Sequence, residues 1–195
     1  MTQRPTITIH GRGSHGMVVF DAMKAANPSA VVRWTDDAEG ERPSDRDYFI
    51  AAIGDNRARS RFRGLMTVIH PTALISPAAE VGEGTFIAAR AFIGPKAKVG
   101  RGAIINTGAV IEHECIVGDF AHIASGAILS GRAEVGEGAL VGAGAVIRFG
   151  QKVGAWATVG CGAVVVKDVP AGEVWVGNPA RKQGARQCTS ASTPS

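Results

Sequence analysis

The chain has 195 residues, of which 45% are hydrophobic and 19% are charged, a composition typical of a folded protein rather than a disordered one. Its formal net charge of +4 is spread along the chain without a basic arm or stripe, which argues against nucleic-acid binding. No uninterrupted apolar run approaches the about 20 residues of a membrane-spanning helix, and the N-terminus has no apolar stretch of signal-peptide length.

The cysteines indicate a reducing location. Cys115, Cys161 and Cys188 are odd in number and lack the spacing of metal ligands, so neither a disulfide framework nor a structural zinc site is expected. We therefore expect a cytoplasmic protein that holds no metal.

Residues 1–68 are expected to form a small α/β domain. Apolar patterns predict strands at residues 5–9, 31–34 and 48–53, and helices at 17–26 and 57–65. This order of elements is typical of a truncated, Rossmann-like nucleotide-binding fold with parallel strands.

A glycine-rich loop, Gly11–Gly16, links the first predicted strand to the first predicted helix. Backbone N–H groups at the start of such a helix can hold an anion, which makes several residues of the loop candidate ligand contacts: Gly11, Gly13, Ser14 and His15. Asp36 and Asp37 follow the second strand at about the distance of the acidic residue in a dinucleotide fingerprint. Because the domain is only about half as long as a dinucleotide domain, we favour a mononucleotide such as a nucleotide sugar over NAD.

An internal repeat begins at Ile69. An aliphatic residue recurs at every sixth position up to Val165, seventeen times without a slip. The position four residues after each aliphatic is small in almost every repeat, with Gln151 as the exception, and glycine often follows the aliphatic directly.

A period of six fits neither a helix face nor a hairpin. In a strand, the small residue and the aliphatic two positions later share one face, and glycine permits a tight turn after them. The repeat therefore predicts a parallel β-helix of stacked coils over residues 69–176, followed by a tail at 177–195 that is disordered after about residue 184.

One repeat carries titratable side chains where its neighbours have glycine. The hexad that starts at Ile111 places His113 between Glu112 and Glu114, and a neighbouring carboxylate orients an imidazole and raises its proton affinity. These side chains do not point inward, so the cluster is either a general base with its partner or a solvated patch. Cys115 falls on the small inward position and is expected to fill the core.

Together these features resemble the left-handed β-helix acyltransferases with hexapeptide repeats, and among them the sialic-acid O-acetyltransferase and bacillosamine-type amino-sugar N-acetyltransferase family. The resemblance covers about residues 5–182. It rests on the glycine loop, the His113–Glu114 pair and further matches at Asn106, His122, Ser125-Gly126-Ala127, Gly131 and residues 176–181. It implies three repeats per coil, acetyl-CoA as co-substrate, and a homotrimer with sites between neighbouring subunits.

The resemblance also implies a role for each matching residue. His113 would be the general base, and Glu114 would hold it. The acceptor would be bound by Gly11, Gly13, Ser14, His15, Asp36, Asp37 and Asn106. Acetyl-CoA would contact His122, the backbone N–H of Gly131, Gly160, Ala163, Pro179 and Arg181. Arg12 departs from the family, whose loops usually have a small residue there, so it could bind phosphate or alter which sugar is accepted.

The favoured function is acetyl transfer from acetyl-CoA to the amino group of a nucleotide-linked amino sugar, with a 4-amino sugar preferred. Direct attack is expected, because no placed Ser or Cys has a base beside it. The first alternative is O-acetylation of sialic acid or a related sugar hydroxyl, and the second is a non-catalytic hexapeptide-repeat scaffold. A carbonic-anhydrase-like zinc site is disfavoured, because no third outward histidine accompanies His113 and His122.

Overall fold

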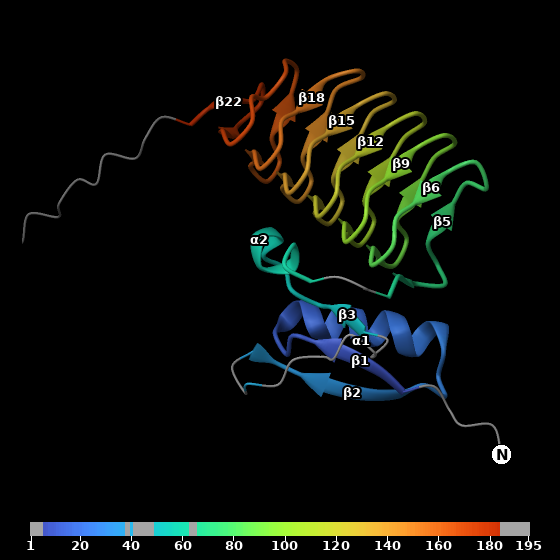
Figure 1. The fold of residues 1–195 in the computed structure, drawn as a ribbon. Coiled ribbons are helices and arrows are strands. Elements are labelled where there is room, and N and C mark those ends of the chain that lie inside the picture. Colours follow the sequence, from blue (N-terminus) through green and yellow to red (C-terminus); the bar gives the residue numbers. More distant parts are fainter. Residues whose placement is uncertain (1–5, 38–39, 41–48, 63–65, 184–195) are drawn as a thin grey trace, which may run out of the picture.

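The computed structural model describes residues 6–37, 40, 49–62 and 66–183. It shows a small N-terminal unit lying against one side of a long parallel β-solenoid (Figure 1). The disorder expected after about residue 184 lies outside the described residues, as does the first residue of the strand expected at 48–53.

The N-terminal unit is built on a parallel sheet with the strand order β2-β1-β3. Its strands are β1 (Thr6–His10), β2 (Val31–Thr35) and β3 (Phe49–Ala51), and α1 (Ser14–Ala26) follows the glycine loop. Each element overlaps the strand or helix expected from the sequence, and Ile7, Ile9, Val19, Met23 and Ile50 from these elements share one buried cluster.

Helix α2 (Asn56–Arg59) is shorter than the helix expected at 57–65. Asp55 caps its start by accepting a hydrogen bond from the backbone N–H of Ala58, at 2.7 Å. The helix ends where the guanidinium of Arg59 bonds backbone carbonyls of the solenoid, which ties this turn down. Residues 63–65 lie outside the described part of the chain.

The solenoid has three walls, each a sheet of short strands. Wall 1 contains β4 (Val68–Ile69), β7 (Phe86–Ile87), β10 (Ile104–Ile105), β13 (His122–Ile123), β16 (Leu140–Val141), β19 (Thr158–Val159), β21 (Val174–Val176) and β22 (Arg181–Lys182). Wall 2 contains β5 (Leu74–Ile75), β8 (Phe92–Ile93), β11 (Val110–Ile111), β14 (Ile128–Leu129), β17 (Val146–Ile147) and β20 (Val164–Val165). Wall 3 contains β6 (Glu80–Val81), β9 (Lys98–Val99), β12 (Ile116–Val117), β15 (Glu134–Val135) and β18 (Lys152–Val153).

The strand register confirms the repeat. Ile105 pairs with Ile123 on wall 1, and Ile111 pairs with Leu129 on wall 2, so one coil takes 18 residues, or three hexads. Wall 2 has six strands, which makes the solenoid about six coils tall.

The two inward columns expected from the sequence form the core. The recurring Ile, Val and Leu residues and the small residues between them lie in a single buried cluster. Cys115 belongs to it, and burial raises the pKa of its thiol to about 11, so it is a core residue and not a nucleophile.

The glycine that follows each aliphatic has a different role from the one expected. A Cβ at Gly100 would lie 2.6 Å from the backbone nitrogen of Asp119, so this glycine lets successive coils approach each other. The left-handed turn residue comes two positions later, at Gly102 with φ +60°. Non-glycine residues also occupy that turn position, among them Glu114, Phe120 and Trp156.

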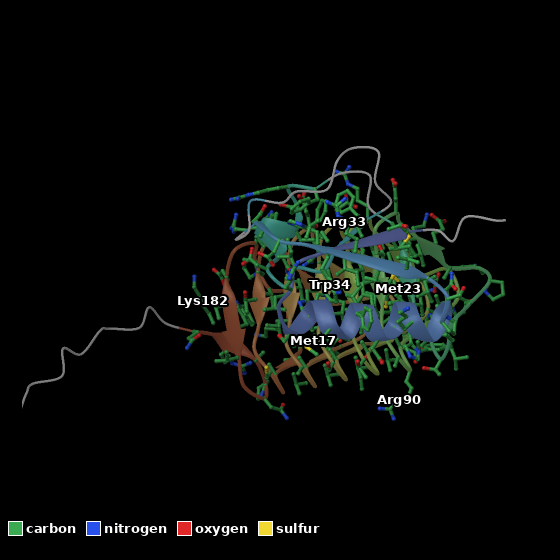
Figure 2. All side chains as sticks on the ribbon, turned by 90° about the horizontal axis from the view of Figure 1, so that it is seen from below. Met17, Met23, Arg33, Trp34, Arg90 and Lys182 are labelled. Carbon is green, nitrogen blue, oxygen red and sulfur yellow. The ribbon has the colours of Figure 1, made fainter. Side chains whose placement is uncertain are left out.

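Wall 1 is partly covered by the N-terminal unit. Val19 and Met23 of α1 share a buried cluster with Val68, Phe86 and Ile104, whose side chains face outward from the wall. Figure 2 shows α1 running across the coils, with Met17 and Met23 labelled along it. The contact places the start of α1, and therefore His15, against wall 1.

The C-terminal end of the solenoid is closed by a change in strand direction. β22 pairs antiparallel with β21, whereas the other ladders of the solenoid are parallel. Ala180, just before β22, is buried in the end of the core, and Trp175 packs against it.

Among the described residues, no helix is long and apolar enough to span a membrane. The same residues contain no group of three or more His, Cys, Asp or Glu side chains placed to hold a metal ion.

Candidate active site

Two histidines from distant parts of the sequence meet between the N-terminal unit and wall 1. His15 lies in the first turn of α1, and His122 points outward from β13. Their ring centroids are 6.3 Å apart, and His15 packs edge-on against Phe86 at 5.3 Å. The Nε2 of His122 lies 3.4 Å from the amide nitrogen of Asn106, and the His122 ring also hydrogen-bonds the backbone carbonyl of Gly54.

Both rings are neutral at pH 7. Burial lowers the pKa of His15 to about 4 and that of His122 to about 4, and the nearby charge of Arg59 acts in the same direction on each. A neutral imidazole offers one donor and one acceptor, and the His122 ring directs these to Gly54 and Asn106, so it joins the N-terminal unit to wall 1 without adding a charge.

The second cluster lies at the turn between β11 and β12. Nδ1 of His113 is 3.2 Å from Oε2 of Glu114, and Nε of Arg132 is 3.1 Å from the same oxygen. The hydrogen bonds from Arg132 and then His113 hold the pKa of Glu114 below its usual value, so the carboxylate stays ionised. A neutral His113 ring that donates from Nδ1 to Glu114 carries its lone pair on Nε2, the arrangement of a general base.

The open side of His113 faces Gly131. A Cβ at Gly131 would lie 2.5 Å from Nε2 of His113, so the ring lies directly over this glycine, and a larger residue there would require the half-exposed ring to move. Phe149 lies beside the ring, with the two centroids 6.4 Å apart, and Arg132 lies over Phe149 at 5.7 Å. The cluster is exposed, with 46% of the His113 side chain accessible.

One chain does not bring the two clusters together. His113 lies at the corner between walls 2 and 3, whereas His122 lies on wall 1, which faces that corner across the prism. The aliphatic core fills the space between them. The residues expected to act together therefore divide into two groups: an acceptor side with His15, Asn106 and also His122, which was expected to contact acetyl-CoA, and a base side with His113, Glu114 and the expected coenzyme contact Gly131.

The glycine loop borders a cavity of about 400 Å³. Its lining includes the loop and acidic residues expected from the sequence: Gly11, Gly13, Ser14, His15, Asp36 and Asp37. Arg12 donates its backbone N–H to Asp36 at 2.8 Å, and it lines a smaller cavity of about 220 Å³ with Met17 and Trp34. The sequence analysis missed His10, which lines the loop cavity and contacts Thr35 at 3.0 Å.

A second cavity of about 400 Å³ lies on wall 1 beneath α2. Its floor is the outward column His122, Leu140 and Thr158, and its rim is the turn from Gly54 to Arg57. The guanidinium of Arg57 lies over Trp156 at 4.5 Å. Gly54 lines both of these cavities.

The remaining expected contacts lie near the C-terminal end of the solenoid. Gly160 follows β19, and Pro179 and Arg181 are exposed near β22. Ala163 differs from the expectation, because it is fully buried in the core and its N–H bonds the carbonyl of Gly160 at 3.2 Å. It therefore offers no side-chain contact to a coenzyme.

No family model matches the chain, and no curated protein matches it. Solved structures do match. The acetyltransferase domain of PglB from Neisseria gonorrhoeae is 31% identical, with 92% of this chain and 100% of that chain covered and a TM-score of 0.85. PerB from Caulobacter crescentus, in complex with CoA and GDP-perosamine, is 33% identical, with 92% and 97% covered and a TM-score of 0.83. WeeI from Acinetobacter baumannii is 25% identical, with 91% and 99% covered and a TM-score of 0.82.

The fold and these likenesses define a left-handed β-helix acyltransferase that uses acetyl-CoA to acetylate a sugar. The chain belongs to the family of bacillosamine- and perosamine-type sugar N-acetyltransferases that includes PglB and PerB. The amino-sugar half of the expected resemblance is thereby confirmed, and the sialic-acid O-acetyltransferase half stays a prediction.

Proposed function

We propose that the protein transfers the acetyl group of acetyl-CoA to the amino group of a nucleotide-linked amino sugar, with a 4-amino sugar preferred. The observation that carries this proposal is a pair of cavities that share Gly54 in their linings, one bordered by His15 and the other by His122. Among the relatives, PerB is described with CoA and GDP-perosamine bound, and the PglB domain with acetyl coenzyme A.

The two parts of the chain divide the substrates in this proposal. Residues 1–68 form a truncated Rossmann-like domain that holds the nucleotide, because the glycine loop presents backbone N–H groups at the start of α1 to a phosphate. Asp36 and Asp37 face the same cavity and suit ribose or sugar hydroxyls. The β-helix, residues 69–176, and the segment that follows it hold acetyl-CoA, with Gly160, Pro179 and Arg181 along the coenzyme.

His113 acts as the general base. Its Nε2 removes a proton from the amine while the amine nitrogen attacks the thioester carbonyl carbon. The carbon–sulfur bond then breaks, coenzyme A leaves as the thiolate, and the proton on His113 is returned to it. Glu114 holds the imidazolium through Nδ1, and in this proposal the backbone N–H of Gly131 stabilises the oxyanion. For one relative, the perosamine N-acetyltransferase, two of the solved structures are of variants in which a histidine is replaced.

A second copy of the chain completes the site. Within one chain the base side and the acceptor side lie on opposite sides of the prism, so His113 must serve the acceptor side of a neighbour. In a cyclic trimer each chain has one neighbour on either side, and the third chain contacts the first, so the assembly is a closed ring.

Wall 2 is the surface best suited to this assembly. Its outward column is apolar from end to end: Leu74, Phe92, Val110, Ile128, Val146 and Val164. Wall 3 instead carries ion pairs between Lys98 and Glu80 and between Lys152 and Glu134. A continuous apolar column that is exposed at Leu74 and Ile128 and partly exposed along the rest of its length marks an interaction surface. Wall 2 also adjoins both the corner of His113 and the corner of Asn106.

The proposal can be tested by incubating purified protein and acetyl-CoA with each acceptor of a panel. The panel contains nucleotide-linked 3-amino and 4-amino sugars and free sialic acid. We expect release of the coenzyme thiol only with an amino sugar, and a product heavier by one acetyl group that resists mild alkali. Acetylation of sialic acid alone, with an alkali-labile product, would favour the O-acetyltransferase. Coenzyme binding without turnover of any acceptor would favour the scaffold.

A further inference from the structure

Arg59 is a buried cation in α2 whose hydrogen bonds join the two parts of the molecule. Only 2% of the residue is exposed. Its Nε donates to the carbonyl of Gly102 at 2.8 Å and its Nη2 to the carbonyl of Phe120 at 2.7 Å, which lie on successive coils of the solenoid. Its Nη1 donates to the carbonyl of Ile53 at 2.7 Å, in the turn after β3.

Keeping a charge in this place is costly. Burial lowers the pKa of Arg59 to about 10, although Asp55 nearby acts in the opposite direction. Replacing buried charges by well-packed apolar side chains is often neutral or stabilising, so a clamp that served only stability would not require a guanidinium. The planar guanidinium of Arg59 has a capacity that an apolar side chain lacks, because its N–H donors hold several backbone carbonyls in a fixed relative orientation.

The turn that Arg59 holds is part of the acceptor side. Gly54 lines both large cavities, and its carbonyl accepts a hydrogen bond from the ring of His122. Nη1 of Arg59 lies 3.4 Å from that same carbonyl. A chain of contacts therefore runs from the buried guanidinium through Gly54 to His122.

The rest of α2 is anchored beside it. Nδ2 of Asn56 donates to the carbonyl of Gly138 at 3.0 Å, and Oδ1 of Asn56 accepts from Nη2 of Arg59 at 2.9 Å. Arg57 lies over Trp156, one coil further along. The rim of the second cavity is thus attached to the solenoid at several successive coils, with Arg59 at its buried end.

We propose that Arg59 is a positioning residue for acetyl transfer: by pinning the Ile53–Gly54 turn to the solenoid, it holds the Gly54 carbonyl against His122 and fixes the part of the lining that the two cavities share. This inference rests on the proposed function. It predicts that loosening the fork lowers the rate of transfer without weakening the binding of the coenzyme, which lies on the solenoid.

Arg59→Lys keeps the charge and loses the fork, and Arg101→Lys is the matched control. Arg101 lies at the same corner, stacked on Phe120, and pairs with Asp119 at the surface. For Arg59→Lys we expect kcat per coenzyme-binding site, counted by calorimetry, to fall about tenfold or more, because small misplacements of reacting groups cost up to about 10² in rate. The KM for acetyl-CoA should stay within about twofold, and the control should match the wild type.

The pH profile separates positioning from a purely structural role. In Arg59→Met the guanidinium charge is gone as well, and with it the smaller of the two main causes that lower the pKa of His15 and of His122, so the titrations of both rings, followed by NMR, should move to higher pH while burial still holds them below 6.5. Arg59→Lys should not show this shift. The other titratable or charged groups around these rings, in the described part of the chain, are the same in both variants: His10, Asp36, Asp37, Asp55 and Arg57.

Several outcomes would overturn the inference. Wild-type kcat in Arg59→Lys would do so, as would a loss confined to the KM for acetyl-CoA. If Arg59→Lys does not fold, Asn56→Ala loosens the same guanidinium more gently, and it should lower kcat about threefold with an unchanged KM for acetyl-CoA. If instead the wild-type protein acetylates no amino sugar, the proposed function fails first, and the inference fails with it.

Discussion

One carboxylate oxygen of Glu114 accepts hydrogen bonds from two donors, and this arrangement determines how His113, the proposed base, is oriented. Nδ1 of His113 and Nε of Arg132 both approach Oε2. Because Arg132 keeps the carboxylate ionised, Glu114 can accept from the imidazole throughout the neutral pH range. The imidazole is then fixed in the tautomer that leaves Nε2 free to take a proton.

His113→Ala should lower kcat by about 10²–10⁴, the usual loss when a general base is removed. Because His113 is half-exposed, the free energy of unfolding should change by no more than about 0.5 kcal/mol. His70→Ala, at a turn of the first coil, is the matched control and should be fully active. An amine acceptor should be partly rescued at high pH, where it loses its proton unaided, and a hydroxyl acceptor should not. A folded variant with activity within about threefold of wild type would remove His113 from the mechanism.

The buried histidines should make the protein less stable as the pH falls. The pKa of His15 and of His122 is about 4 in the folded protein and 6.5 in the unfolded chain, so between these values only the unfolded state takes up the protons. Stability is therefore full above pH 6.5 and is lost towards pH 4, by about 2 kcal/mol per histidine at pH 5. Urea unfolding at pH 7.5 and 5.0 measures this difference. It should shrink in His122→Gln and persist in His70→Gln, and an equal difference in both variants would contradict the assignment.

At the scale of the elements, the sequence predicts the coil well, because each strand repeats one local rule. The six-residue spacing gives the inward columns, the 18-residue register and the buried place of Cys115. The same rule puts Ala163 at a small inward position, inside the core. The expected contact between Ala163 and the coenzyme was therefore inconsistent with the six-residue repeat. The role of Gly100 could not be derived from spacing, because it depends on how closely two coils approach.

The residues that link the two parts of the chain carry no such pattern. Arg59 bonds Gly102, which is 43 positions away, and Asn56 bonds Gly138, which is 82 positions away. Neither spacing is a multiple of a coil or marks a motif, so only the folded chain shows that α2 lies across the solenoid. The division of His113 and His122 between opposite sides of the prism, by contrast, follows from the repeat, because the two residues are half an 18-residue coil apart.

The inner column of small residues sets the thickness of each coil. Ala109→Leu should reduce the free energy of unfolding by about 1–3 kcal/mol, because Ala109 is fully buried and a larger side chain must push two walls apart. Ala78→Leu adds the same atoms at an exposed turn and should change it by no more than about 0.5 kcal/mol. Chemical denaturation of both variants makes the comparison, and equal stabilities would mean that the column is not close-packed.

At the scale of the whole molecule, the three walls differ in what covers them. Wall 1 bears the N-terminal unit, wall 3 bears ion pairs, and wall 2 bears an apolar column. If wall 2 is the contact between copies, light scattering should give about three times the chain mass of 20.1 kDa.

Ile128→Glu should break that assembly and abolish acetyl transfer with it, because a charge in the middle of an apolar contact is left without a partner. Ile116→Glu is the matched control, since Ile116 is exposed to a similar degree, 46% against 38%, but lies on wall 3 between charged neighbours. The control should keep both its mass and its activity. A monomeric Ile128→Glu protein with full activity would show that one chain suffices for catalysis.

The antiparallel pairing of β22 with β21 helps to explain why such a protein does not stack end to end into fibres. A stack of parallel coils offers a ladder of unpaired backbone groups at each end, and one stack could in principle add to the next without limit. By reversing direction, β22 presents a short strand of the wrong polarity, carrying Arg181 and Lys182, where a further coil would have to join. The folded chain can therefore associate side by side through its walls, while growth along the solenoid axis stops at this end.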